Sequence, residues 1–395
     1  MMRACPICEN KKVDILHSQR FVLPEGHPLS EGYNVVCCQS CGFVYADTTV
    51  TQEAYDHFYA QYSKYEDKKT GTGGVDNPFD LKRQQDTARQ IADFLHDPKA
   101  NILDVGCANG GMLLALRELN YHSLCGIDPS PACVENTRLL GIEAHIGSLF
   151  QPFQENTFDC VILSHTLEHV QDVRTALTWI ENRLKPNGVL YIETPDAARY
   201  EDFIYAPFQD FNTEHINHFS LTCLENLMQI HGFSLSSGGA KDLVAGVDLF
   251  YPAVFGFWKK TTKSENLPMN KDHALRIRIE EYIRSSRQMM AAIELSIAQM
   301  LNEKRPIIVW GTGQLAMKLL AETSLAHAEI LAFVDNNPIN HGKSLLGKSI
   351  ISPLDLDKWD APILITTLLH HKIIAKQIRD MGISNEILFL QGEHS

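Results

Sequence analysis

A short segment that combines a carboxylate with two histidines is the first candidate for chemistry. The string FNTEHINHFS, at positions 211–220, places Glu214, His215 and His218 close together. A histidine beside a carboxylate is a common arrangement for a base that is neutral near pH 7 and able to take a proton. We therefore predict a general base here, with His215 as first candidate and His218 as second. The alternative is a surface loop whose histidines only cap or pack.

Two cysteine pairs form a second group with chemical potential. The strings CPIC and CQSC each space two thiols as a metal knuckle does, and Gly42 follows the second pair as a tight turn requires. Four thiolates close a tetrahedral site and leave no open position, so we predict structural zinc rather than catalytic zinc. Chance pairs or a disulfide are the alternatives, and the adjacent Cys37 is a bystander. The predicted zinc ligands are Cys5, Cys8, Cys38 and Cys41.

A glycine turn between two apolar runs predicts a nucleotide-type ligand. The run ILDV ends before Gly106, a helical pattern follows Gly110, and a second run, LCGI, ends at Asp128. Gly106 allows a sharp turn off the strand, Gly110 allows close approach of a ligand, and the acid can hydrogen-bond a ribose. The spacing is not GxGxxG. It suits an adenosine-type ligand without a pyrophosphate better than a dinucleotide.

Alternating strands and helices must position these residues. A helix at 81–95 and further strands at 142–146, 158–163 and 184–195 predict an α/β fold with a doubly wound sheet at about 82–250. The strand at 158–163 ends in SHTLEHV. This string brings Ser164, His165 and His169 to the carboxyl edge of the sheet, where such folds bind ligands.

The C-terminal part repeats the pattern of strand, glycine turn and helix. After a packing helix expected at 272–304, Gly311, Gly313 and Ala316 form GxGxxA, and Asp335 ends the next strand. This is a second nucleotide-binding fingerprint, but a Rossmann-like fold can persist without a ligand. A reductase that binds NAD here is an alternative, although no second catalytic set surrounds the fingerprint.

Composition narrows the classes of function. The chain has 395 residues, 44% of them hydrophobic, and a net charge of −13, so we expect more than one well-packed domain. It has no Lys/Arg run for nucleic acid and no apolar stretch of the roughly 20 residues that span a membrane. With no apolar signal core at the N-terminus and cysteines in metal-like or core positions, we expect a cytoplasmic protein.

The stretch from Ile102 to Asp128 resembles motif I of the class I S-adenosylmethionine (AdoMet) methyltransferases. The resemblance implies AdoMet as cofactor, with its adenine near the string GSL that follows the strand at 142–146. The residues expected to bind AdoMet are Asp104, Gly106, Gly110, Asp128, Pro129, Ser148, Leu149 and Ser164.

The order of parts is similar to that of the deoxysugar C-methyltransferases. Two N-terminal CxxC knuckles, an AdoMet domain with EH after its fifth strand, and a C-terminal domain with WGTGQLA and FVDNNP share this order. The resemblance implies methylation at carbon 3 of a nucleotide-linked 4-keto-6-deoxyhexose, which in that family lies between the AdoMet domain and the C-terminal domain. A base removes the hydrogen next to the ketone, and the enolate carbon attacks the methyl group.

The same resemblance assigns roles to residues near the site. His215 corresponds to the base, with Glu214 as its neighbour, and His169 corresponds to the histidine of the LEHV string. Tyr62 and Tyr65 are candidates for an aromatic hydroxyl that serves the site. Asn212 stands where the family carries a tyrosine, so the identity of the sugar stays open.

These expectations divide the chain into four parts: a zinc-binding module (1–65), an AdoMet-dependent methyltransferase domain (66–255), a connecting helix (256–304) and a Rossmann-like domain (305–395). A glycine-rich loop at 66–80 either closes over the site or is a linker. The expected partner is a nucleotide sugar, and the protein is expected to be a monomer or homodimer. Alternatives are an O- or N-methyltransferase on another small molecule, and a non-catalytic zinc-bearing scaffold with a vestigial AdoMet fold.

Overall fold

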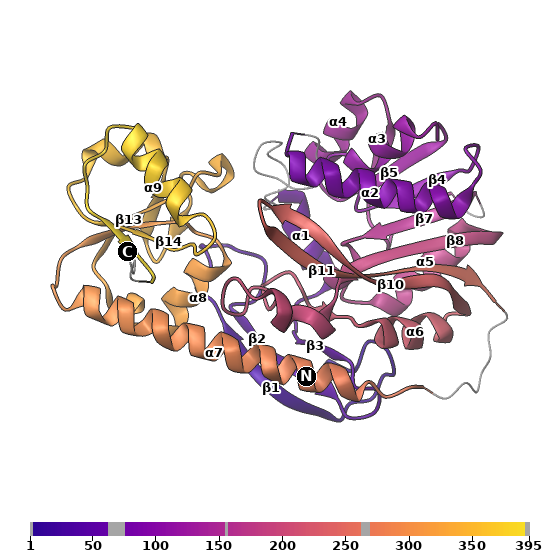
Figure 1. Cartoon of the computed structure of the whole chain (residues 1–395), viewed down its shortest axis with the longest axis horizontal. Helices are drawn as coiled ribbons and strands as arrows, with labels where there is room; N and C mark the ends of the chain where they lie inside the picture. Colours follow the sequence, from indigo (N-terminus) through magenta and orange to yellow (C-terminus); the bar gives the residue numbers. More distant parts are fainter. Residues whose placement is uncertain (1–2, 62–75, 155–156, 262–268, 392–395) are drawn as a thin grey trace. The chain divides into compact units, whose positions relative to one another are not determined.

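The computed structural model describes residues 3–61, 76–154, 157–261 and 269–391 (Figure 1). They fall into two compact units, each assembled from several segments. The first unit comprises Met1–Leu16, Val35–Phe203 and Glu214–Ile279, and the second comprises His17–Asn34, Ile204–Thr213 and Glu280–Ser395. Both units are discontinuous along the chain, so they do not correspond one to one to the four consecutive domains expected from the sequence. That division stays a prediction.

A seven-stranded sheet forms the centre of the first unit, in the order β10-β11-β8-β7-β4-β5-β6. Strands β4 to β8 are parallel, and β10 and β11 add an antiparallel pair beside β8. Successive connections reverse direction between β4 and β7, which confirms the predicted doubly wound α/β fold. The strands are β4 (Ile102–Val105), β5 (Leu124–Asp128), β6 (Glu143–Ile146), β7 (Phe158–Ser164), β8 (Leu184–Pro195), β10 (Phe233–Gly246) and β11 (Leu249–Lys260). Strand β11 runs through position 255, where the sequence suggested a boundary.

Helices cover both faces of this sheet. Figure 1 shows α2 (Pro78–Leu95), α3 (Gly111–Glu118) and α4 (Pro131–Leu139) on one face, with α5 (Val173–Arg183) and α6 (Leu221–Ile230) on the other. Helix α2 begins earlier than the predicted position 81, because the Asn77 side chain caps it and Pro78 fits its first position.

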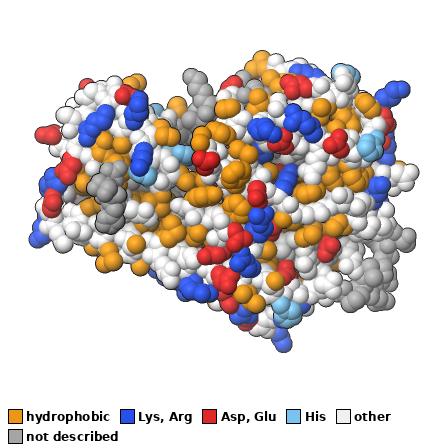
Figure 2. Space-filling view, viewed as in Figure 1, with side chains coloured by type: hydrophobic (Ala, Val, Ile, Leu, Met, Phe, Trp, Pro, Cys, Tyr) orange, Lys and Arg blue, Asp and Glu red, His pale blue; other side chains and the backbone are white. Residues whose placement is uncertain are grey.

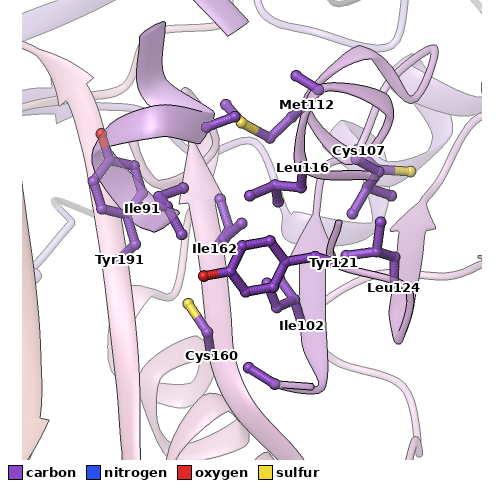
Figure 3. Packing of buried hydrophobic residues seen from close by; sticks show 14 of the residues in the cluster. Ile91, Ile102, Cys107, Met112, Leu116, Tyr121, Leu124, Cys160, Ile162 and Tyr191 are labelled. Atoms are coloured by element: carbon purple, nitrogen blue, oxygen red, sulfur yellow. The ribbon is translucent and has the colours of Figure 1, made fainter. Parts of the chain in front are cut away.

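The core lies between the sheet and helices α2 and α3. Ile91 of α2 and Leu116 of α3 pack against Ile102 and Ile162 of the central strands (Figure 3). Cys160 of β7 joins this cluster as a small apolar residue. Since these strands are covered on both faces, they read as continuous apolar runs in the sequence, which is why they were predictable.

A smaller sheet is built by the N-terminal segment, in the order β1-β2-β3-β9. Its last strand comes from the region after β8, and it pairs Val44 with His218. Arg3 braces this join, because its guanidinium donates to the carbonyl oxygens of Ala46 and Ile216 at 3.3 Å. The elements are β1 (Val13–Arg20), β2 (Gly32–Cys38), β3 (Val44–Asp47), β9 (Asn217–His218) and the following helix α1 (Gln52–Gln61).

The second unit contains a six-stranded sheet of Rossmann-like character, in the order β14-β15-β13-β12-β16-β17. All of its pairings are parallel except β14 with β15. Helix α7 (His273–Leu301) contributes residues to both units. The remaining elements are β12 (Ile307–Trp310), α8 (Gln314–Glu322), β13 (Ile330–Val334), β14 (Ser344–Leu345), β15 (Lys348–Ile351), β16 (Ile363–Ile365), α9 (His371–Asp380) and β17 (Ile387–Phe389).

The surface carries charges of both signs. On the face shown in Figure 2, Lys and Arg side chains alternate with Asp and Glu rather than gathering into one basic field. Within the described ranges, no helix has the length and apolar character to cross a membrane.

Candidate functional site

A cavity of about 190 Å³ lies at the carboxyl edge of the large sheet. The ends of β4, β5 and β7 supply its floor, at the point where the strand order reverses and open α/β sheets bind ligands. Of the expected cofactor residues, most line this cavity: Asp104, Gly106, Asp128, Pro129, Ser148, Leu149 and Ser164.

The two glycines of the turn have different roles. Gly106 lines the cavity with φ of 78°, and a side chain there would meet Thr166 Oγ1. Gly110 caps α3 with φ of 79°, and a Cβ on it would lie 2.8 Å from Thr137 Oγ1. Gly110 was expected to admit a ligand. The structure instead gives it a backbone reason, because its left-handed φ and the neighbouring threonine both require glycine.

Two buried carboxylates define the centre of the cavity. Asp128 accepts backbone N–H groups from Ala108 at 2.9 Å and Ser130 at 2.8 Å. Burial raises the pKa of Asp128 to about 6, and burial together with the Asp128 charge raises the pKa of Asp104 to about 7. Because each oxygen accepts one of these hydrogen bonds, the Asp128 carboxylate retains acceptor capacity for a ligand hydroxyl.

Near the ends of β7 and β8, charged side chains form a buried network that was not predicted from the sequence. His165 lies between Glu168 and Glu193, with Nδ1 3.4 Å from Glu168 Oε1 and Nε2 3.2 Å from Glu193 Oε1. Burial alone would lower the pKa of His165, but the two carboxylates raise it to about 9. Lys241 pairs with the second oxygen of Glu193. Two anions therefore face two cations, which offsets the cost of burying each charge.

Glu193 is the hub of this network. Its side chain is 1% exposed, and it also accepts the hydroxyl of Tyr191 at 2.7 Å. Burial would raise the pKa of Glu193, but Lys241 and His165 outweigh burial and hold that pKa below its usual range. The string IETP gave no signal for this role, because the partners lie far away in the chain.

The histidines predicted from the sequence come together at the edge of the cavity. His169, which lines the cavity, donates from Nδ1 to the carbonyl oxygen of Glu214 at 3.1 Å. The rings of His169 and His215 lie 4.9 Å apart at 67°, and both side chains lie within 4.8 Å of Glu168 through their ligand atoms. Since a carbonyl only accepts, Nε2 of neutral His169 carries the lone pair.

Tyr59 of α1 supplies an aromatic hydroxyl to this cluster. Its hydroxyl donates to Glu214 Oε2 at 3.4 Å, and its ring packs edge-on against His169 at 5.6 Å. The sequence suggested Tyr62 or Tyr65 for such a role, and both lie outside the described residues, as does most of the glycine-rich loop. The signal for Tyr59 was its position three residues before Tyr62, since residues three apart are neighbours on a helix.

Two other candidates lie elsewhere. His218 is fully buried in β9, 3.3 Å from the Tyr200 hydroxyl, and burial lowers its pKa to about 3. Asn212 belongs to the second unit, where its side-chain amide donates to the Gln209 carbonyl at 3.4 Å. The structure therefore brings His169, Glu214 and His215 together within the first unit.

The four predicted zinc ligands also converge. Cys5 Sγ lies 3.6 Å from Cys41 Sγ, Cys8 Sγ lies 3.4 Å from Cys38 Sγ, and all four sulfur atoms lie within 4.8 Å of one another. None of the ten cysteines forms a disulfide in the described chain, which includes them all. Gly42 has φ of 80°, as the predicted tight turn requires.

Comparison with known proteins identifies two parts of the chain. Residues 79–237 match the family model described as Methyltransferase domain, and residues 303–388 match the one described as C2185-like, N-terminal. The first match contains β4 to β8 and the loops around the cavity. This part of the chain is therefore similar to methyltransferase domains.

Curated relatives cover the methyltransferase domain with different reactions. Ubiquinone biosynthesis O-methyltransferase, mitochondrial, of Rattus norvegicus is 28% identical over 216 residues, which are 48% of this chain and 58% of the relative. Arginine-hydroxylase NDUFAF5, mitochondrial, of Homo sapiens is 31% identical over 112 residues, 27% of this chain and 32% of the relative. Trans-aconitate 2-methyltransferase of Enterobacter sp. (strain 638) is 30% identical over 124 residues, 30% of this chain and 48% of the relative. The chain thus spans less than two thirds of each relative.

The cavity of the methyltransferase domain is completed from outside the matched residues. Gln52, Asp56 and Tyr59 of α1 line it, although α1 precedes the match. Their spacing places them on one helical face, since residues four and three apart are neighbours on a helix. The cavity is therefore lined in part by residues that lie outside the matched range.

The glycine turn of the second unit holds its acid differently. Asp335 accepts the Thr312 N–H at 3.2 Å and the Thr312 hydroxyl on one oxygen, and the Asn340 amide also reaches that oxygen at 3.2 Å. Its other oxygen accepts the Asn337 N–H at 2.8 Å. This carboxylate is engaged in holding its own loop.

Proposed function

We propose that the chain is an AdoMet-dependent C-methyltransferase that acts on a nucleotide-linked 4-keto-6-deoxyhexose at carbon 3. The observation that carries this proposal is the pair of His169 and His215 at the edge of the cofactor cavity. The similarity of the order of parts to the deoxysugar C-methyltransferases supplies the acceptor class.

The cavity lining suits a cationic cofactor. Asp56, Asp104, Asp128 and Glu193 all line it, and the ribose-type acceptor Asp128 lies at the end of β5. Bound AdoMet would supply an electrophilic methyl group on a positively charged sulfur. A carboxylate-rich wall attracts that charge, and Asp128 would orient the ribose hydroxyls.

The histidine pair suits removal of a proton from carbon. A hydrogen next to a ketone is weakly acidic, so a base must approach it in a site that excludes water. His169 presents Nε2 because Nδ1 donates to the Glu214 carbonyl, and His215 lies beside it. We propose His215 as the base, with His169 as its neighbour on the cavity wall and the Tyr59 hydroxyl near Glu214 as a donor for the developing enolate.

The four-cysteine cluster supports a structural zinc ion. Sulfur atoms that lie mutually within 4.8 Å in two CxxC turns fit the donor set of a closed tetrahedral site. Zinc bound there would fix β2 relative to the N-terminal turn and take no part in methyl transfer.

Mass spectrometry in deuterated water tests the proposal. The purified protein is incubated with AdoMet and a dTDP-4-keto-6-deoxyhexose, and the sugar nucleotide is weighed. We expect a gain of one methyl group and, without AdoMet, deuterium exchange at the carbon next to the ketone. His215→Ala should abolish both gains.

A different outcome would redirect the acceptor search. If the protein binds AdoMet but neither methylates nor exchanges the sugar carbon, keto sugars are excluded and an O- or N-methyltransferase of a small molecule is favoured. If AdoMet does not bind, the vestigial scaffold is favoured.

A further inference from the structure

One face of α1 forms a wall of the cofactor cavity and carries a carboxylate with no role in the proton transfer proposed above. Gln52, Asp56 and Tyr59 line the cavity from this face. Gln52 fixes the helix in place, because its side-chain oxygen Oε1 accepts the Gln171 N–H at 2.9 Å. The wall is thus anchored to the loop before α5.

Asp56 joins α1 to the loop that follows β6. Its Oδ2 accepts the Ser148 hydroxyl at 3.1 Å, and its Oδ1 accepts the Gln52 amide at 2.8 Å. The side chain is half-buried, and burial raises its pKa. A carboxylate offers about four acceptor positions, so these two bonds leave Asp56, which lines the cavity, with acceptor capacity for a ligand.

The strand order sets the direction in which a bound nucleoside extends. The sheet runs β7-β4-β5-β6, with His169 and the candidate base beyond the end of β7 and Asp128 at the end of β5. A methyl group must face the base, and the ribose must reach Asp128. The nucleobase therefore extends away from β7, toward the β6 loop and Ser148.

We infer that Asp56 accepts a hydrogen bond from the 6-amino group of the AdoMet adenine and so selects an adenine over a 6-oxo purine. This inference rests on the proposed function in one respect, that AdoMet occupies this cavity. An exocyclic amino group only donates, and Asp56 is the acidic side chain that contacts the loop at this end of the cavity. A carboxylate acceptor strengthens such a bond relative to a neutral one.

The test compares two ligands that differ at one position of the base. Binding of S-adenosylhomocysteine and of S-inosylhomocysteine, which has oxygen in place of the 6-amino group, is measured by calorimetry on the metal-loaded full chain. We expect the wild-type protein to prefer the adenine ligand by roughly tenfold or more, since a carboxylate that faces the 6-oxo group loses a bond and meets an acceptor.

Asp56→Asn should reduce this preference by roughly tenfold, because an amide can turn its NH₂ toward the 6-oxo group. The change keeps the side-chain volume, so it should preserve α1. Glu53→Gln, an exposed position on the same helix, is the matched control and should leave both affinities unchanged.

Asp128→Asn distinguishes recognition of the ribose from recognition of the base. It should weaken both ligands equally, because they share the ribose, and so leave their ratio unchanged. An unaltered ratio in Asp56→Asn, with normal binding of S-adenosylhomocysteine by the wild type, would overturn the inference and leave the proposed function standing. If the wild type binds neither ligand, the proposed function fails first, and the role of Asp56 falls with it.

Discussion

The turn after β4 in the first unit and the turn after β12 in the second share one order of parts, but their acids are used differently. Asp128 receives one backbone N–H on each oxygen. Asp335 receives four donors from Thr312, Asn337 and Asn340, three of them on one oxygen, which leaves it less acceptor capacity than Asp128. A glycine turn followed by an acid therefore indicates a fold, whereas the remaining acceptor capacity of the acid indicates whether a ligand can be held.

The strands that precede the two turns, β4 and β12, also differ in whether they carry an ionisable side chain. Two residues before its glycine, β4 carries Asp104, and β12 carries the buried Val309 at the corresponding place. The first turn thus lies over ionisable groups at the end of a cavity, and the second lies over an apolar strand. Matched substitutions in the two units test whether cofactor binding and methyl transfer depend on the first unit alone.

The largest effect is expected at the candidate base. His215→Ala should lower the rate of methyl transfer by roughly 10²- to 10⁴-fold, since general-base catalysis contributes about that much, while binding of S-adenosylhomocysteine is retained. His341→Ala is the matched change in the second unit, where His341 donates to the Asp335 carbonyl at 2.7 Å. It should leave the rate unchanged. Rates and calorimetry measure both. Loss of cofactor binding in His215→Ala would move His215 into the cofactor site.

Metal removal should also act on the first unit. All ten cysteines belong to it, so chelation or Cys38→Ser should lower its stability by an amount on the order of several kcal/mol. Hydrogen exchange read by mass spectrometry should rise in 35–47 and 214–220 and stay constant in 305–391. Cys37 has a buried thiol that contacts the Gly42 carbonyl at 3.5 Å and the Cys38 carbonyl at 3.8 Å, and it is not one of the four clustered thiols, so Cys37→Ser should keep the bound metal. Equal metal content in wild type and Cys38→Ser would argue against the zinc site.

Replacing each of the two acids by asparagine tests whether only Asp128 contributes to ligand binding. Asp128→Asn should weaken S-adenosylhomocysteine binding by roughly 10- to 100-fold, because an amide accepts on one side only and loses a charge-assisted bond. Asp335→Asn should leave that affinity intact and lower the unfolding temperature, since the donors of its loop lose a carboxylate acceptor. Calorimetry and thermal unfolding separate the two effects. Equal losses of affinity would mean that both turns serve the cofactor.

The smallest effect concerns pH. Because the folded state raises the pKa of Asp104 from 3.8 to about 7, it holds this proton more tightly than the unfolded chain does. Stability should therefore fall as the pH rises from about 4 to 7. In Asp104→Asn this contribution is absent, so its free energy of unfolding between pH 6 and pH 8 should fall less than that of wild type, by an amount on the order of 1 kcal/mol. Urea unfolding at the two pH values measures it, and parallel profiles would contradict it.

Much of this architecture could be predicted because short windows of the sequence determine it. Buried parallel strands read as apolar runs, and the CxxC turns and glycine turns have fixed spacing, so β4 to β8 and the four clustered cysteines follow from short windows of sequence. The convergence of His169 with His215 followed from the resemblance to a family rather than from any local pattern.

The remaining features depend on contacts between distant residues. His165, Glu193 and Lys241 form one buried network, yet no window of sequence contains all three. Asp56 reaches the cavity from a helix that precedes the glycine turn. Asn212 and Glu214 are two positions apart in the chain and belong to different units. Spacing alone carries no information about such partners.

The pairing of β9 with β3 has a consequence for how this chain can be shortened. Strand β3 begins just after Cys41, and its partner β9 begins two residues after His215. A fragment limited to residues 79–237 would keep the glycine turn but lose the strand that holds the histidine segment and the helix that bears Asp56 and Tyr59. Residues 79–237 alone therefore do not contain the whole site, and a chimera must also include the N-terminal segment with β3 and α1.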